Sequence, residues 1–166
     1  FYPYCSRRRG FALKQGDIIL NLFDTINLLD NAIHWLQRSY TICSGIGVKE
    51  NYTEEEYDAL ETLTSRFARV SDIIIQKAFR SIDAVEFENK GTLIDVVNRA
   101  HKRGFFESIE KLREIRELRN SIAHEYIQEG LADTFSDVLR FTPELFDIAT
   151  RIKHYCKKYE IKEGQS

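Results

Sequence analysis

The chain is poor in the residues that interrupt helices. Its 166 residues include only two prolines and eight glycines, so few positions force a turn. This scarcity favours long helices over a turn-rich β fold. A chain of this length suffices for one domain and can bury roughly 70% of the surface that its unfolded form exposes. We therefore expect a single helical domain over residues 1–166 that needs no covalent or metal staple.

Paired cysteines and long apolar runs are also missing. Cys5, Cys43 and Cys156 are odd in number and have no CxxC spacing, which indicates reduced thiols in a cytoplasmic protein. The most apolar stretch, DIILNLF, is ended by Asp24 and is far too short to cross a membrane. We expect no membrane partner.

Charge of one sign is not in excess. Lys and Arg number 24 against 26 Asp and Glu, with a net charge of −2. This balance excludes a broadly basic surface but leaves room for a local basic site. The arginines at 7–9 precede no long apolar stretch, so the start is not a signal peptide. We expect residues 1–10 to form a flexible, solvated flank, with an RNA-contacting arm as the alternative.

Patterns for metals and phosphate loops are absent as well. The four histidines, His34, His101, His124 and His154, are far apart, and there is no HExxH motif or Cys/His cluster. The glycine-containing stretch SGIGVKEN lacks the Lys-Ser/Thr ending of a phosphate-binding loop. We expect neither a metal nor another cofactor.

What the sequence does contain is helical periodicity. Apolar residues recur at steps of three and four, as from Ile18 to Leu36, and no segment alternates like a strand. Counting capping residues, we predict helices over about residues 11–43, 53–85, 92–104, 108–128 and 131–161. Short connections make neighbouring helices antiparallel. The predicted fold is all-α: an up-down four-helix-bundle core with one additional short helix.

Residues at the predicted helix ends support these boundaries. Thr53 with Glu56 three residues later is typical of a capping box, and Thr92 is a suitable cap for the short helix. Gly130 is expected to end the fourth helix. Pro143 removes a helical hydrogen bond and is expected to bend the last one.

The fourth predicted helix contains the stretch ELRNSIAHEY. With Ile115 at 0° and about 100° per residue, Arg119 falls near +40° and Tyr126 near +20°, inside the apolar face. A tyrosine there is usually a core residue, and an arginine can extend its stem over apolar surface. An arginine in that position is nevertheless costly unless it is paired or faces a wet cleft.

Asn120 and His124 share the opposite face of this helix, at about 140° and 180°. A histidine on a polar face is most often simply solvated. Arg119 and His124 are separated by about 140°. Arg119 and His124 can act on one ligand in three ways: the helix deforms, the arginine reaches round it, or a second copy supplies half of the site. The sequence does not choose among these.

The residues from Arg119 to Tyr126 match R-x4-H-x-Y, with an Asn directly after the Arg. The chain thereby resembles the HEPN superfamily, and most closely its HepT-like branch, the toxins of HepT/MntA toxin–antitoxin pairs. The stretches SRFARVSDIII and TLIDVVNRAHKRGFF fit the layout of that family, and the likeness covers about residues 15–160.

This resemblance implies a homodimer whose two motifs meet in a composite cleft that cleaves RNA without metal. His124 would handle protons around a ribose 2′-OH attack, Arg119 would stabilise the phosphorane, and Asn120 would orient the histidine or the phosphate. Tyr126 matches the tyrosine that an MntA-like nucleotidyltransferase antitoxin adenylylates to silence the toxin.

Two other functions remain open. HEPN domains also include non-catalytic binding partners of a nucleotidyltransferase, and this chain lacks the signature of that enzyme, a Gly-Ser followed by paired aspartates. The motif could also be a coincidence in a helical dimer that performs no chemistry.

Overall fold

The computed structural model describes residues 4–88, 90–124 and 131–160, with side chains omitted for 4–14 and 131. Within these ranges every regular element is a helix and there is no strand, which confirms the predicted all-helical class. The elements are α1 (Tyr4–Ile46), α2 (Glu54–Asp72), the π-helical segment η1 (Ile73–Ala78), α3 (Phe79–Val85), α4 (Leu93–Lys102), α5 (Ile109–His124) and α6 (Leu131–Glu160).

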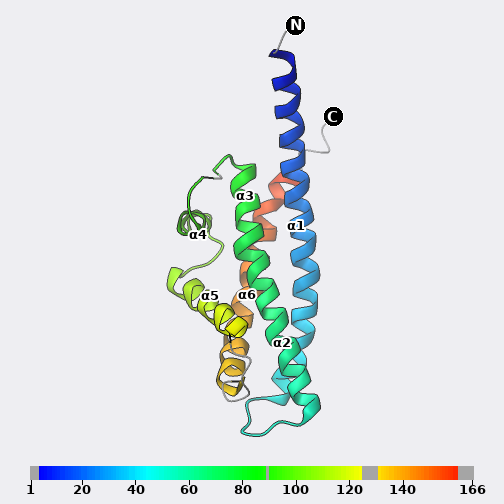
Figure 1. Ribbon diagram of the computed structural model, residues 1–166, viewed down its shortest axis with the longest axis vertical. Coiled ribbons are helices and arrows are strands. Elements are labelled where there is room, and N and C mark those ends of the chain that lie inside the picture. Colours follow the sequence, from blue (N-terminus) through cyan, green and yellow to red (C-terminus); the bar gives the residue numbers. More distant parts are fainter. Residues whose placement is uncertain (1–3, 89, 125–130, 161–166) are drawn as a thin grey trace.

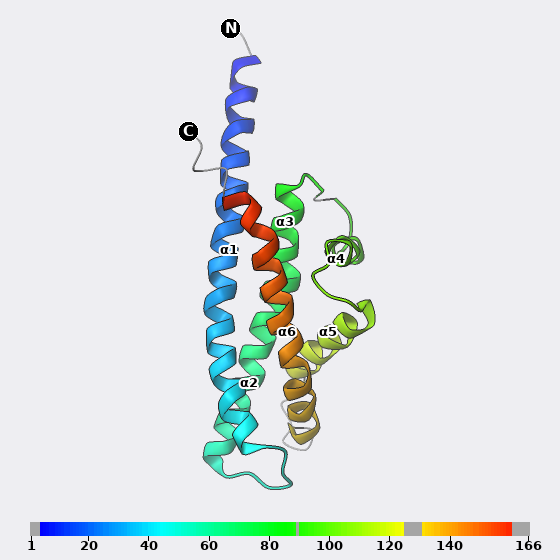
Figure 2. The same ribbon diagram turned by 180° about the vertical axis from the view of Figure 1, so that it is seen from behind.

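Three long rods run side by side and make the body of the bundle (Figure 1). α1 and α6 are two of them, and α2, η1 and α3 join end to end as the third. α5 packs obliquely against α2 and α6, and the short α4 lies beside α3 and α5, as the reverse view also shows (Figure 2). The bundle prediction with one short extra helix is confirmed, although the fourth core helix, α5, is strongly tilted.

The helix ends follow the expected capping chemistry in most places. The Glu56 backbone N–H donates to Thr53 Oγ1 at 3.2 Å, and the Thr53 N–H donates to Glu56 Oε1 at 3.0 Å, so the predicted capping box is present. Gly104 follows α4 with φ of 82°, a left-handed conformation that glycine adopts without a steric penalty.

The predicted start of the first helix was wrong. α1 begins at Tyr4 rather than near Phe11, so residues 4–10 of the expected flexible flank are helical. Arginine is a good helix former, and a single glycine costs only about 1 kcal/mol in a helix. Gly10 alone therefore does not end the helix. The predicted Gly130 cap lies outside the described residues.

The core is filled from every long rod by large apolar side chains. Phe67, Phe79, Phe105 and Phe135 are all fully buried, and the Phe79 and Phe105 rings stack at 5.9 Å between centroids. Pro143 lies inside α6, which continues through it to Glu160. The helix continues because the adjoining turns are buried, and their packing on the core can offset one lost helical hydrogen bond.

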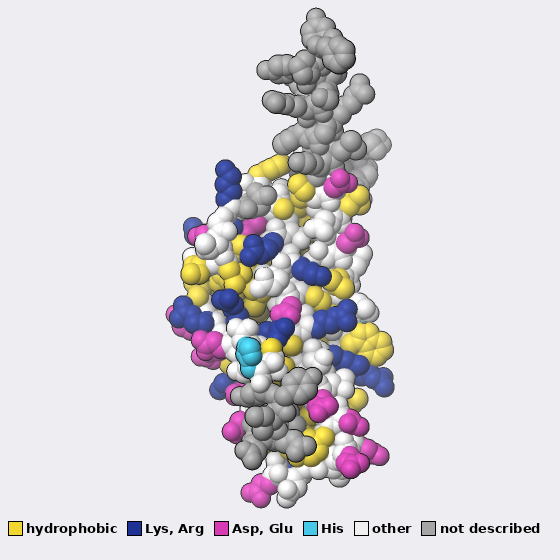
Figure 3. Space-filling view, in the orientation of Figure 1, with side chains coloured by type: hydrophobic (Ala, Val, Ile, Leu, Met, Phe, Trp, Pro, Cys, Tyr) yellow, Lys and Arg dark blue, Asp and Glu magenta, His cyan; other side chains and the backbone are white. Residues whose placement is uncertain are grey.

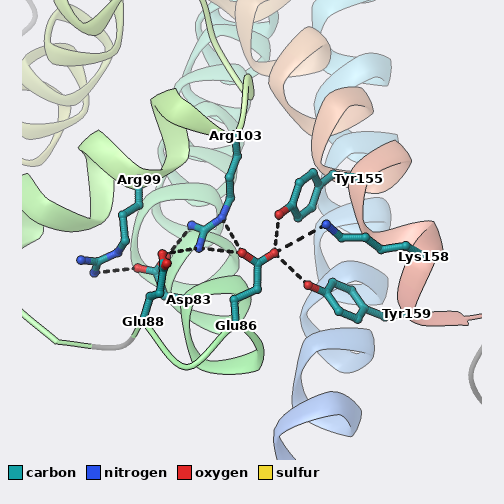
Figure 4. Close-up of polar contacts among 8 residues, drawn as sticks. All are labelled: Asp83, Glu86, Glu88, Arg99, Arg103, Tyr155, Lys158 and Tyr159. Atoms are coloured by element: carbon teal, nitrogen blue, oxygen red, sulfur yellow. Dashed lines mark hydrogen bonds and ion pairs between the residues drawn. The ribbon is translucent and has the colours of Figure 1, made fainter.

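A buried ionic cluster joins α3, α4 and α6 (Figure 4). Asp83, whose side chain is 1% exposed, accepts a hydrogen bond from Arg103. Arg103 also donates to Glu86 at 3.1 Å, and Glu86 accepts from the hydroxyls of Tyr155 and Tyr159. Burial opposes the charge on Arg103, but its bond to Asp83 and the charge of Glu86 outweigh this and raise its pKa. The cluster fixes α4, and hence the start of α5, against the bundle.

Cys43 and Cys156 are buried, unpaired thiols, as the cysteine count predicted. Burial raises the pKa of Cys156 to about 12, so its reactive thiolate form is rare near neutral pH. Neither thiol is a candidate nucleophile.

Candidate active site on helix α5

Arg119 is held by a partner that the sequence did not reveal. Its Nε and Nη2 donate to Asp72 Oδ1 and Oδ2 at 2.8 and 2.9 Å, a bidentate pair across α2 and α5. The hydrogen bond that Arg119 donates to Asp72 raises the pKa of the arginine, and partial burial opposes this. The arginine is thus a permanent, oriented cation at the surface, with 27% of its side chain exposed. This ion pair offsets the desolvation cost that we expected for an arginine on the apolar face of the helix.

Asp72 is the last residue of α2 before the π-helical turn. Ile73, Ile74 and Ile75 follow it in η1 and are all buried. π-helical turns are rare and occur often at functional sites. No periodicity in the sequence indicates this change of pitch, which is why Asp72 could not be paired with Arg119 from the sequence.

Asn120 and His124 lie on the outer face of α5, as predicted. Both are exposed and stand four residues apart on one side of the helix. Within the described part of the chain, neither side chain has a hydrogen-bond or ionic partner.

One chain does not bring Arg119 and His124 onto one face. α5 is regular α-helix from Ile109 to His124, so the separation of about 140° remains. The guanidinium is directed at Asp72 on α2, while the imidazole is exposed at the end of α5. Local deformation of α5 is therefore not the way in which these residues meet. Tyr126 lies outside the described residues.

Arginines and glutamates lie on different sides of α5. Arg113, Arg116 and Arg119 fall at about 160°, 100° and 40° around the helix, while its glutamates fall between about 200° and 260°. The basic side faces α2 and η1, since Arg119 pairs there. Figure 3 shows Lys and Arg side chains gathered across the middle of the same face of the molecule. The α2–α3 rod also carries exposed basic residues: Arg69, Lys77 and Arg80. A local basic surface exists despite the net charge of −2.

No candidate metal site is found in the described ranges. They contain no group of three or more His, Cys, Asp or Glu placed to hold a metal ion. None of the described helices is both long and apolar enough to span a bilayer. No family model, curated protein or solved structure matches this chain.

Proposed function

We propose that this protein is a metal-independent endoribonuclease of the HEPN type, the toxin of a toxin–antitoxin pair. The observation that carries the proposal is the state of the motif on α5. Arg119 is charged and oriented by Asp72, and Asn120 and His124 are exposed and bound to no other described side chain. These are the properties that a phosphate-binding cation and a proton-transferring histidine require.

The proposed reaction is attack of a ribose 2′-OH on the adjacent phosphorus. His124 takes the hydroxyl proton, the new O–P bond forms, and the bond to the 5′-oxygen of the next nucleotide breaks. The departing oxygen takes up a proton from water, leaving a 2′,3′-cyclic phosphate and a 5′-OH end. Arg119 stabilises the added negative charge on the phosphorane, and Asn120 positions the phosphate or the imidazole.

A homodimer would reconcile this chemistry with the geometry of a single chain. Arg119 of one protomer and His124 of its partner would then face one phosphate. A cognate nucleotidyltransferase antitoxin would silence the site by adenylylating Tyr126, because the added nucleotide brings bulk and negative charge next to the motif.

A non-catalytic binding module is the second candidate. The separation of Arg119 and His124 around one helix favours it, because a chain that never assembles the two residues has no active site. In this case the protein would serve only as the partner of a nucleotidyltransferase.

The deciding experiment is cleavage of an end-labelled RNA in excess EDTA by the wild type, His124→Ala and His154→Ala. His154 is an exposed histidine on α6 and serves as the matched control. We expect wild type and His154→Ala to cut, leaving cyclic-phosphate ends, and His124→Ala to be inactive. Intact mass verifies that the wild type carries no nucleotide, as on Tyr126. If this unmodified protein leaves RNA uncut, the nuclease proposal is wrong and the binding module is favoured.

A further inference from the structure

A small apolar cavity lies between η1, α4 and α5. Its volume is about 140 Å³. It is lined by aliphatic side chains, by one amide and by two guanidinium groups: Ile75, Leu93, Ile94, Val97, Asn98, Ile109, Leu112, Arg113 and Arg116. Drug-sized ligands occupy pockets of roughly 300–1,000 Å³, so this one has room for a single ring system.

Its two arginines have no hydrogen-bonded carboxylate partner among the described residues, although Arg113 interacts electrostatically with Glu110, three residues before it on α5. Lys111 pairs with Glu144, and Arg119 pairs with Asp72. Arg113 and Arg116 are exposed and form no ion pair with any described residue. Two exposed cations at the rim of an apolar cavity are suited to a ligand with an apolar body and an anionic group. Guanidinium matches phosphate oxygens and also stacks on planar rings.

The other lining groups suit the ring of such a ligand. Ile94 on α4 is 69% exposed, an unusual position for so large an apolar side chain, and it offers a face for a ring to cover. Asn98, also exposed, carries both an amide donor and a carbonyl acceptor at the cavity, as the edge of a nucleobase requires.

The cavity also lies next to the proposed catalytic arginine. Arg113, Arg116 and Arg119 are spaced three residues apart, so each lies about 4.5 Å further along α5 than the one before. A strand whose phosphate contacts Arg119 can place a neighbouring phosphate at Arg116 and a neighbouring base in the cavity.

We propose that this cavity is a binding site for a nucleoside phosphate: the base enters between Ile94 and Ile109, and the phosphate is bound by Arg113 and Arg116. As a subsite for RNA, it rests on the proposed function. As a site for a nucleoside phosphate, it does not require cleavage.

The test is a titration, by NMR or calorimetry, of three probes: 5′-AMP, adenosine and ribose 5-phosphate. We expect 5′-AMP to bind about tenfold more tightly than ribose 5-phosphate, because base contacts are lost in the latter. We expect a similar loss for adenosine, because it has no charged partner for the arginines. Equal affinity of 5′-AMP and ribose 5-phosphate would overturn the proposal.

Variants locate the site. Arg116→Gln should weaken 5′-AMP binding about tenfold, whereas Arg38→Gln should not, because Arg38 is an exposed arginine on α1 that pairs with no described residue. Ile94→Ala should weaken it several-fold, whereas Leu20→Ala, 56% exposed on α1, should not. All four positions are at the surface, and thermal unfolding checks that each variant remains folded. If Ile94→Ala changes the oligomeric state and not 5′-AMP affinity, a second copy covers the cavity and the proposal is wrong.

Two further measurements separate this proposal from the nuclease. A ribotrinucleotide that binds more tightly than 5′-AMP assigns the site to an RNA strand, and equal affinity assigns it to a free nucleotide. Selective 5′-AMP binding by a protein that cuts no RNA would uphold the cavity site and reject the nuclease. RNA cleavage without discrimination between 5′-AMP and ribose 5-phosphate would do the reverse.

Discussion

Both carboxylate oxygens of Asp72 accept hydrogen bonds from the Arg119 guanidinium, at 2.8 and 2.9 Å. The contact joins α2 to α5 and leaves Nη1 of the arginine without a bond to Asp72. In the proposed nuclease, Asp72 is therefore a positioning residue that fixes where the cation points and does not touch the RNA itself.

Asp72→Asn should separate activity from stability. The pair is partly exposed, at 27% for the arginine side chain and 47% for the aspartate, so we expect the free energy of unfolding to fall by less than about 1 kcal/mol. Loss of orientation should lower kcat for RNA cleavage roughly tenfold to a hundredfold, with little change in KM. Asp58→Asn is the control, because Asp58 is exposed on the same helix and forms no ion pair with a described residue. If both variants cleave equally, Asp72 has no positioning role.

The sequence predicted the helices far better than it predicted the contacts of the site. Apolar steps of three and four and the Thr53 cap are local signals, and the helices that they indicate are present. The Asp72–Arg119 pair joins residues 47 positions apart. No local pattern encodes such a contact, because it depends on the pitch of η1 and the tilt of α5.

The placement of Asn120 and His124 could be predicted because it needs only the helical repeat. How Arg119 and His124 meet could not be predicted, since it depends on surfaces outside one helix. The same holds for the cavity beside Arg116, whose walls come from three separate elements. The net charge of the chain did not indicate the basic side of α5, because the glutamates on the other side of this helix balance its arginines.

Asp83→Asn should strongly destabilise the fold. Asp83 is buried, and Arg103, with 7% of its side chain exposed, would lose one of its three carboxylate partners and keep Glu86 and Glu88. Removing one partner of a buried pair typically costs about 3–5 kcal/mol. Denaturation in urea measures this cost. Glu88→Gln is the matched control, since Glu88 pairs with the same arginine but is 56% exposed. Similar losses for the two variants would show that burial does not set the strength of this cluster.

Glu86→Gln should reduce the sensitivity of the protein to acid. Burial raises the pKa of Glu86, but hydrogen bonds from Tyr155 and Tyr159 and the charge of Arg103 outweigh it, so the pKa is lowered. A lowered pKa stabilises the fold above the unfolded value of about 4.3, and this contribution is lost as pH falls through the folded value.

The stability difference between wild type and Glu86→Gln should therefore be largest near neutral pH and shrink below about pH 4.3. Urea unfolding of both proteins at several pH values measures it. Glu144→Gln is a suitable control, because Glu144 has one ion pair, to Lys111, and no tyrosine partner. A difference that stays constant with pH would show that Glu86 titrates alike in the folded and unfolded states.

Mixed dimers test whether the proposed site is shared between two copies. Arg119→Gln and His124→Ala should each abolish RNA cleavage when pure. In a mixed dimer, the first chain supplies His124 and the second supplies Arg119, so one of the two composite sites is intact. Equal co-expression should then restore about a quarter of the wild-type rate, because half of the dimers are mixed and each has one site.

The control for this recovery is the double variant Arg119→Gln/His124→Ala, co-expressed with Arg119→Gln. No intact site can form in that mixture, so it should stay inactive. Native mass spectrometry verifies that mixed dimers are present in both preparations. If mixed dimers of the single variants form and remain inactive while wild type cleaves, the two residues act within one chain. Arg119 would then have to leave Asp72 and reach round α5 to His124, which the bidentate pair in this structure opposes.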